Sequence, residues 1–416
     1  MINQAHLESR LKIMDPEDFF FEMGPIRPPS EGQDHSLLIR PTRNCSWNLC
    51  TFCATYKGEK FSYRKVEAIK QDIQVAKTLH DEILGVSHRL GFNGRIGRQV
   101  VAAILEANPQ VYGEGAAAAE TLARRHQNLV NVANWLGSGA KTVFLQDADA
   151  LIMRTPDLLE IIRYLKETFP TLARVTAYAR SKSCARKSSA ELAELHQAGL
   201  SRLHVGLESG CEAVLKFVRK GVTAGEQLEG GLKVKEAGIS LSEYVMPGLG
   251  GRQWSQPHAL DSAALLSDLD PDFIRLRSLA LRRHSPLLAQ AQAGEFAELL
   301  EDQVVEEIGS FIEKLHCRAY VASDQMANLL FGVEGQLPQD KEKMLKVITS
   351  YLTMLPMERL AFRLSQRLRS FLAVYGCLTL EVSEKVGEAR EALKKESLDA
   401  EAKVNAAIAA LKEGFV

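Results

Sequence analysis

Three cysteines lie within nine residues of one another near the start of the chain, at Cys45, Cys50 and Cys53. Thiolates are soft ligands that bind zinc, copper and iron–sulfur clusters. A structural zinc site normally takes four protein ligands, and no second CxxC or CxxH motif follows nearby to supply the fourth. Three thiolates on a four-iron cluster instead leave one iron open to another ligand. The spacing favours a [4Fe–4S] cluster, with a structural zinc site as the alternative.

The four remaining cysteines have no cluster-like spacing. An odd total of seven cysteines in a chain of 416 residues argues against a disulfide framework. We interpret these four as small apolar side chains and predict no second cluster. They are Cys184, Cys211, Cys317 and Cys377.

Short apolar runs alternate with stretches of helical spacing and predict the elements that position the cysteines. The first run, residues 36–40, leads almost directly into the cysteine loop. Strands separated by helices are typical of parallel βα units, and active sites in such folds lie at the carboxyl ends of the strands. Six such units predict an α/β fold that is a partial (β/α)6 barrel. The expected strands are residues 36–40, 142–146, 174–179, 202–207, 239–246 and 273–279.

Changes in this pattern predict the domain organisation. Residues 1–35 are expected to be an irregular lead-in, and residues 36–287 the partial barrel, interrupted by a helical insertion at about 84–135. Residues 288–416 are expected to be a mostly helical C-terminal region. Its predicted helices are 294–316, 339–375 and one or two exposed amphipathic helices in 383–411, with a short strand at 317–321.

Composition and charge exclude some classes of function. Lys and Arg total 51 against 52 for Asp and Glu, a balance that argues against a dominant electrostatic interaction with nucleic acid. No apolar run reaches the roughly 18 residues of a membrane span. The first residues mix acids with apolar side chains, unlike a signal peptide. We therefore expect a cytoplasmic protein that does not bind membranes.

The cysteine motif and its position after a strand resemble the radical S-adenosylmethionine (radical SAM) superfamily, over about residues 36–287. The usual motif is Cys-x3-Cys-x2-Cys with an aromatic residue before the last cysteine, which here is Phe52. This chain departs from it in having four residues between the first two cysteines. The downstream strands most resemble the branch of coproporphyrinogen-dehydrogenase-like and elongator-like proteins. The resemblance implies a radical SAM barrel.

The resemblance also implies a reaction and cofactors. Cys45, Cys50 and Cys53 would hold a [4Fe–4S] cluster whose open iron binds SAM. Reductive cleavage of SAM would give a 5′-deoxyadenosyl radical that acts on an unassigned, small-molecule substrate, in anaerobic chemistry. The electron would come from a low-potential donor such as ferredoxin or flavodoxin. The alternative is a non-catalytic iron–sulfur or haem-handling protein of the same fold, and a nucleic-acid substrate is not expected.

Seven residues match positions that the family uses to bind SAM. Their alternative roles are ordinary ones: a surface ion pair for Glu208 and Lys220, helix entry for the two aspartates, and strand faces that sequence alone does not fix. No further catalytic residue is assigned. The expected contacts are Phe52 with adenine, Asp147 and Asp149 with the SAM amino group, Glu208 with the ribose, Lys220 with the SAM carboxylate, Glu243 with the adenosine, and Arg277, on one strand face with Arg275, with SAM or an anionic substrate.

Overall fold

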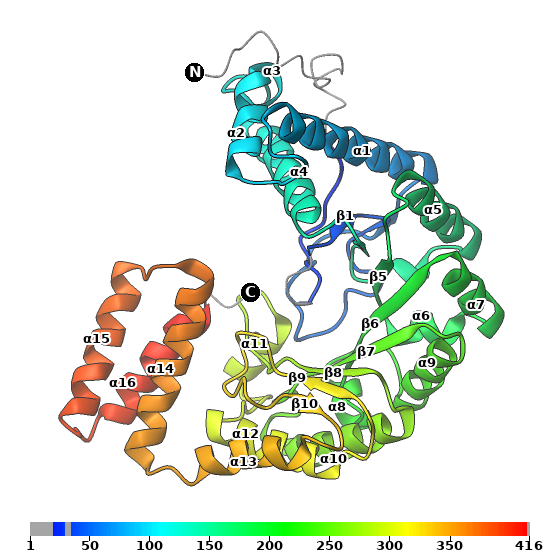
Figure 1. Ribbon diagram of the computed structural model, residues 1–416. Coiled ribbons are helices and arrows are strands. Elements are labelled where there is room, and N and C mark those ends of the chain that lie inside the picture. Colours follow the sequence, from blue (N-terminus) through cyan, green and yellow to red (C-terminus); the bar gives the residue numbers. More distant parts are fainter. Residues whose placement is uncertain (1–19, 30–34, 414–416) are drawn as a thin grey trace. The chain divides into compact units, whose positions relative to one another are not determined.

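The computed structural model describes residues 20–29 and 35–413 (Figure 1). The predicted lead-in falls mostly outside these ranges, and residues 20–29 form neither helix nor strand. The chain divides into two compact units. The first unit contains Met1–Ser46, Glu59–His204 and Glu236–Ser240, and the second contains Trp47–Gly58, Val205–Lys235 and Leu241–Val416.

The main sheet has the strand order β1-β4-β5-β6-β7-β8-β9-β10, which follows the order of the chain. Pairing is parallel from β1 through β4 to β5 and from β7 through β8 to β9, whereas β10 is antiparallel to β9. All six predicted barrel strands are present, and helices connect them, so the prediction of a partial (β/α)6 topology is confirmed. The strands are β1 (Leu37–Ile39), β4 (Thr142–Leu145), β5 (Arg174–Ala179), β6 (Leu200–Glu208), β7 (Ser240–Val245), β8 (Phe273–Leu276), β9 (Tyr320–Ala322) and β10 (Gly335–Gln336).

The strands are short and apolar because a parallel sheet is covered on both faces. Every residue of β1 and β4 is buried. A second, two-stranded sheet pairs β2 (Thr42–Arg43) with β3 (Ser62–Tyr63). This small ladder joins the two ends of the segment that carries the cysteines.

The helices vary in length, and several pack in pairs along the sheet. In the second unit, α10, α12 and α13 lie side by side (Figure 1). The helices are α1 (Val66–Arg89), α2 (Arg98–Ala107), α3 (Pro109–Tyr112), α4 (Ala119–Gly137), α5 (Thr155–Thr168), α6 (Ser181–Arg186), α7 (Ser189–Ala198), α8 (Glu212–Phe217), α9 (Ala224–Glu236), α10 (Gly251–Leu269), α11 (Pro286–Gln292), α12 (Glu301–Lys314), α13 (Lys341–Leu352), α14 (Pro356–Tyr375), α15 (Leu380–Lys394) and α16 (Ala400–Glu413), with a 3-10 turn at Ala150–Ile152. None of the helices in the described ranges combines the length and apolar character that a bilayer crossing needs.

The structure moves two predicted helix boundaries. Helix α1 runs without interruption past residue 84, where the sequence suggested that the insertion begins. The predicted helix 339–375 is two helices, because Pro356 lacks a backbone N–H and forces Leu355 into an extended conformation with ψ 149°. Pro356 instead starts α14, the position in a helix where proline is best tolerated.

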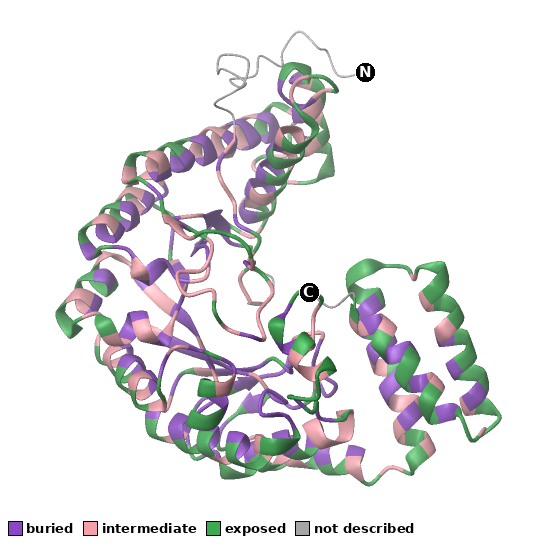
Figure 2. Cartoon of the chain, turned by 180° about the vertical axis from the view of Figure 1, so that it is seen from behind, coloured by how far each residue is buried: buried purple, intermediate pink, exposed green. Residues whose placement is uncertain are grey.

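Helices α14, α15 and α16 share a hydrophobic core of their own. Phe371 and Leu364 of α14 pack with Val386 and Ala389 of α15 and with Val404 of α16. Buried and exposed residues alternate along these helices (Figure 2), as amphipathic helices require. The prediction of amphipathic helices over 383–411 is therefore right in type. Their apolar faces, however, are covered by one another and by α14.

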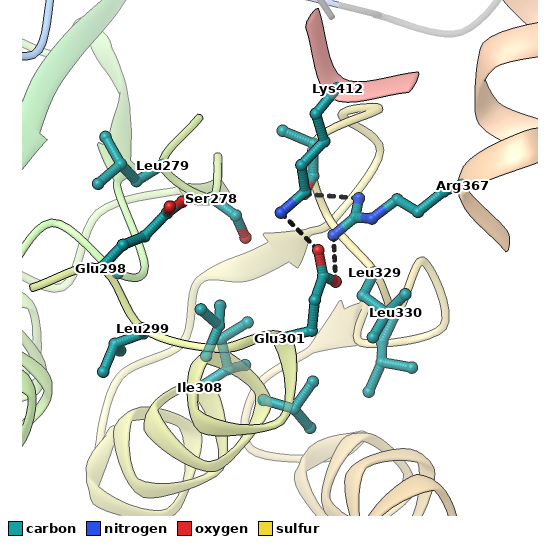
Figure 3. Close-up of a pocket in the computed structure, with 14 residues that line it drawn as sticks. Ser278, Leu279, Glu298, Leu299, Glu301, Ile308, Leu329, Leu330, Arg367 and Lys412 are labelled. Carbon is teal, nitrogen blue, oxygen red and sulfur yellow. Dashed lines mark hydrogen bonds and ion pairs between the residues drawn. The ribbon is translucent and has the colours of Figure 1, made fainter. Parts of the chain in front are cut away.

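A buried ion-pair cluster connects these helices to the start of α12. Arg367 Nη2 lies 2.6 Å from one Glu301 oxygen and Lys412 Nζ lies 2.5 Å from the other (Figure 3). Arg367 Nη1 also donates to the carbonyl oxygens of Met326, Ala327 and Asn328. Burial by itself would raise the pKa of Glu301, but the two cations outweigh it and lower the pKa to about 2. The adjoining cavity of about 20 Å³ has room for about one water molecule.

Candidate active site around the cysteine loop

The cysteine loop follows β1 and is divided between the two units. Cys45 belongs to the first unit, and Cys50 and Cys53 belong to the second. All three are partly exposed, and none forms a disulfide. Within residues 20–29 and 35–413, no three His, Cys, Asp or Glu side chains form a ready-made metal site. The cysteines thus offer thiols of the right kind, without a preassembled cluster site.

In the first unit, two carboxylates hold the residues on either side of Cys45. The backbone N–H of Asn44 donates to Asp147 Oδ2 at 3.0 Å, and the Ser46 hydroxyl donates to Asp149 Oδ2 at 3.1 Å. Both aspartates are fully buried and follow β4. The Gln146 N–H donates to the Ile39 carbonyl at 2.7 Å, so this segment runs beside the end of β1. The two aspartates therefore anchor the backbone that carries the first cysteine.

The other contacts of the two aspartates are also made by the protein. Asp149 accepts from the Ser183 hydroxyl at 2.6 Å and from the Arg180 N–H at 3.2 Å, and burial raises the pKa of its carboxyl. Asp147 Oδ2 accepts from Arg40 Nε at 2.7 Å, while its Oδ1 is buried without a hydrogen-bond partner, in contact with Gly24. The sequence assigned both aspartates to the SAM amino group. The contacts in the structure instead point to a role in positioning Cys45.

In the second unit, the residues between the last two cysteines are fixed by backbone hydrogen bonds. The Thr51 N–H donates to the Val218 carbonyl, and the Thr51 carbonyl accepts from the Leu287 N–H, both at 2.9 Å. Phe52 packs against a core that includes Leu249 and Leu279. One side of the cysteine loop is therefore held by the segment after α8 and by the segment after β8.

Four of the residues assigned to SAM come together in the second unit. Lys220 Nζ lies 3.0 Å from Glu208 Oε1 and 5.7 Å from the centre of the Phe52 ring. Glu208 ends β6 with a positive φ of 62°. Gly206 makes room for the pair, because a Cβ there would lie 2.3 Å from Glu208 Oε1 and 3.0 Å from Lys220 Nζ. The ion pair is therefore built into the end of β6 and lies next to the residue that precedes Cys53.

Glu243 of β7 is the fourth member of this group. Its side chain is only 2% exposed, and its Oε2 is buried without a hydrogen-bond partner. Burial raises the pKa of Glu243 well above its usual value, Lys220 lowers it, and Glu208 raises it further. An unpartnered polar atom beside a lysine and an acid is a feature that a bound polar ligand would satisfy.

The structure adds Trp47 and Gly221, which were not singled out from the sequence. Trp47 Nε1 donates to the Arg219 carbonyl at 2.8 Å, and Gly221, with φ 72°, lies so close that a Cβ would meet the indole ring at 2.4 Å. These contacts fix the turn that carries Lys220. The tryptophan inside the cysteine motif was the signal available in the sequence.

The arginines on β8 separate in role. Arg275 is buried and pairs with Asp324 at 3.3 Å. Arg277 is exposed and lies over the Tyr244 ring, 5.3 Å from its centre. Burial and the like charge of Arg277 lower the pKa of Arg282, and Cys53 acts in the opposite direction. Within the described part of the chain, neither Arg277 nor Arg282 has a carboxylate ion-pair partner.

Two of the remaining cysteines fit the interpretation as small apolar side chains. Cys184 and Cys211 are 1% and 4% exposed. Burial raises the pKa of the Cys211 thiol, which disfavours the reactive thiolate.

No family model matches the chain. Among curated proteins, it is similar to the tRNA uridine(34) acetyltransferases of Methanocaldococcus infernus, with 22% identity over 162 residues, and Methanocaldococcus jannaschii, with 21% identity over 119 residues. These matches cover 38% and 28% of this chain. The chain spans less than a third of the length of these relatives, 30% and 22% respectively.

Three solved structures illustrate the likeness in fold. Coproporphyrinogen III oxidase from Escherichia coli, described as a radical SAM enzyme, has a TM-score of 0.43 and 10% identity, with 93% of this chain and 92% of that chain covered. The archaeal Elp3 of Methanocaldococcus infernus has a TM-score of 0.38 and 15% identity, with 51% and 53% covered. The radical SAM methyltransferase TsrM from Kitasatospora setae has a TM-score of 0.38 and 14% identity, with 61% and 36% covered. The chain resembles radical SAM enzymes, as its sequence predicted.

Proposed function

We propose that this protein is a radical SAM enzyme that cleaves SAM reductively at a [4Fe–4S] cluster held by Cys45, Cys50 and Cys53. When bound, the cluster supplies the electron that breaks a carbon–sulfur bond of SAM and so generates a 5′-deoxyadenosyl radical. The substrate on which this radical acts is unassigned, and the electron donor is a low-potential ferredoxin or flavodoxin.

One observation carries the proposal. Phe52, which directly precedes Cys53, lies under the ammonium group of Lys220, and Lys220 is paired with Glu208 at the end of β6. Residues that the family motif assigns to the cluster and to SAM are thus neighbours in the structure, although up to 168 positions separate them in the chain.

The side chains in this group suit the parts of SAM. Lys220 can bind a carboxylate, and the carboxylates of Glu208 and Glu243 can accept hydrogen bonds from ribose hydroxyls or from the adenine amino group. The unpartnered Glu243 Oε2 is such an acceptor. Arg277 and Arg282 are cations without carboxylate partners in the described residues, and they are suited to an anionic group of the substrate or of SAM.

The test is anaerobic reconstitution with iron and sulfide, followed by SAM and dithionite, with 5′-deoxyadenosine measured by chromatography. We expect 5′-deoxyadenosine from the wild-type protein and none from the Cys50→Ala variant. A protein that loads iron but releases no 5′-deoxyadenosine would be a non-catalytic cluster protein, and one that loads zinc instead of iron would be a structural zinc protein. Either result would overturn the proposal.

A further inference from the structure

A buried hydrogen-bond network centred on His258 links the two turns that follow β6 and β7. His258 Nδ1 lies 2.8 Å from the Ser209 hydroxyl, in the turn after β6, and Nε2 lies 3.1 Å from the Met246 carbonyl, in the turn after β7. The turns also contact each other directly, because the Met246 N–H donates to the Glu208 carbonyl at 3.0 Å. The imidazole thus spans the two turns that contain or adjoin the residues assigned to SAM.

The partners determine where the protons are. The Met246 carbonyl can only accept, so Nε2 carries the hydrogen and Nδ1 accepts from the Ser209 hydroxyl. The same hydroxyl accepts from the Cys211 N–H at 3.0 Å. Burial lowers the pKa of His258 to about 4, which keeps the imidazole neutral at pH 7, as this arrangement requires. Every polar atom of the Ser209–His258 pair has a partner.

Glu307 of α12 extends the network to the next part of the turn after β7. The Gly248 N–H donates to Glu307 Oε1 at 2.6 Å and the Ser255 hydroxyl donates to Oε2 at 2.5 Å. His258 Nε2 lies 3.7 Å from Oε1, beyond hydrogen-bond distance. Glu307 therefore holds the glycine-rich turn against α10 and α12.

A serine, a histidine and a glutamate in a row are also the components of a hydrolase triad. Here, however, Ser209, His258 and Glu307 are only 0%, 1% and 5% exposed. The serine oxygen already accepts a backbone hydrogen bond, so it is not available as a nucleophile. The arrangement can hold backbone segments in place but cannot reach a substrate.

We propose that His258, with Ser209 and Glu307, is a positioning unit that sets the separation of the turns after β6 and β7 and thereby the part of the site that receives the nucleoside of SAM. This inference rests on the proposed function. Glu208 directly precedes Ser209, and Glu243 lies on the strand that leads into Met246. A shift of either turn would move one of these acids relative to the other.

The test uses Ser209→Ala and His258→Gln, with Ser242→Ala as the matched control. Ser242 is also fully buried, on β7, but its hydroxyl has no hydrogen-bond partner. Deuterium exchange of peptides covering residues 208–211 and 246–251 reports on the turns without any cofactor. In the reconstituted proteins, iron content, the Kd of SAM, and KM and kcat for 5′-deoxyadenosine formation report on the site.

We expect exchange in both turns to be roughly tenfold faster in the two variants and the Kd and KM of SAM to rise about tenfold, as for one lost buried hydrogen bond. Iron content and kcat should stay within about twofold of wild type, and Ser242→Ala should behave as wild type. Unchanged exchange, or faster exchange with unchanged SAM affinity, overturns the inference alone. Wild-type protein that loads iron but does not bind SAM overturns the proposed function, and the inference with it.

Discussion

Lys220 and Glu208 form an ion pair with 3.0 Å between Nζ and Oε1, in a space that exists because Gly206 has no side chain. Both side chains are largely buried, with 10% and 14% exposed. A pair in such surroundings holds each charge in one place, and this is useful where a zwitterionic ligand must be bound in one orientation.

Replacing Lys220 by Met should weaken SAM binding. The variant loses the cation assigned to the SAM carboxylate and leaves Glu208 without its ion-pair partner, so we expect the Kd of SAM to rise roughly tenfold or more. Iron content should not change. The control is Lys216→Met, an exposed lysine in the same segment. Equal SAM affinity in wild type and Lys220→Met, measured by equilibrium dialysis, would remove Lys220 from the site.

Asp149→Asn should impair cluster loading. The asparagine cannot accept hydrogen bonds at both positions of the carboxylate, so Ser46, next to Cys45, loses a fixed anchor. We expect iron per chain after reconstitution to fall to roughly half of the wild-type value or less. Glu82→Gln is the matched control, because Glu82 is a buried acid paired with Arg89 at 3.2 Å, within α1. Full iron loading in Asp149→Asn would contradict the positioning role.

The stability of the protein should depend on pH through His258 and Glu307, with opposite signs. Burial lowers the pKa of His258 from 6.5 to about 4, so the unfolded chain binds the extra proton and stability is lost as pH falls through this window. Burial raises the pKa of Glu307 from 4.5 to about 7, so the folded chain binds the extra proton and stability is lost as pH rises through that window. Each effect amounts to about 3 kcal/mol.

The two effects offset each other in the wild type, and variants separate them. With Glu307→Gln, the free energy of unfolding should rise with pH between about 4 and 6.5, and with His258→Gln it should fall between about 4.5 and 7. Urea unfolding over this pH range, compared with wild type, measures both slopes. Slopes of the same sign in the two variants would show that the protonation states are wrong.

The ion-pair cluster at Arg367 should contribute strongly to stability. Arg367→Met leaves three backbone carbonyl oxygens without their donor and Glu301 with Lys412 alone, so we expect a loss of about 3 kcal/mol in the free energy of unfolding. Arg369→Met, on the exposed side of α14, should cost little. The double variant Glu301→Gln with Arg367→Met should cost less than the sum of the two single changes. Strict additivity would show that the pair is not coupled.

The strands could be predicted because their signal is local. The run Arg174–Ala179 is apolar and bounded by polar residues, and it forms β5 over that range. The helix break at Pro356 was also encoded locally, but the periodic residues on both sides of the proline masked it.

The site was predicted only in part, because its contacts join distant segments. Lys220 and Glu208 are twelve residues apart, and the family pattern indicated both. The clamp on Cys45 joins residues about 103 positions apart, and the network of His258 depends on which turns α10 packs against. Neither relationship leaves a spacing that can be read in the chain. Trp47 was visible inside the motif, but its role depends on the position of Arg219.

The most direct test of the central claim is electron paramagnetic resonance of the anaerobically reconstituted, dithionite-reduced protein, with and without SAM. The account predicts about four irons per chain, the signal of a reduced [4Fe–4S] cluster, and a change in that signal when SAM binds the open iron. Cys45→Ser, Cys50→Ser and Cys53→Ser should each lose the signal, and Cys377→Ser, at an exposed cysteine, should keep it. A full signal in any of the three loop variants, or a wild-type signal that SAM leaves unchanged, would contradict the account.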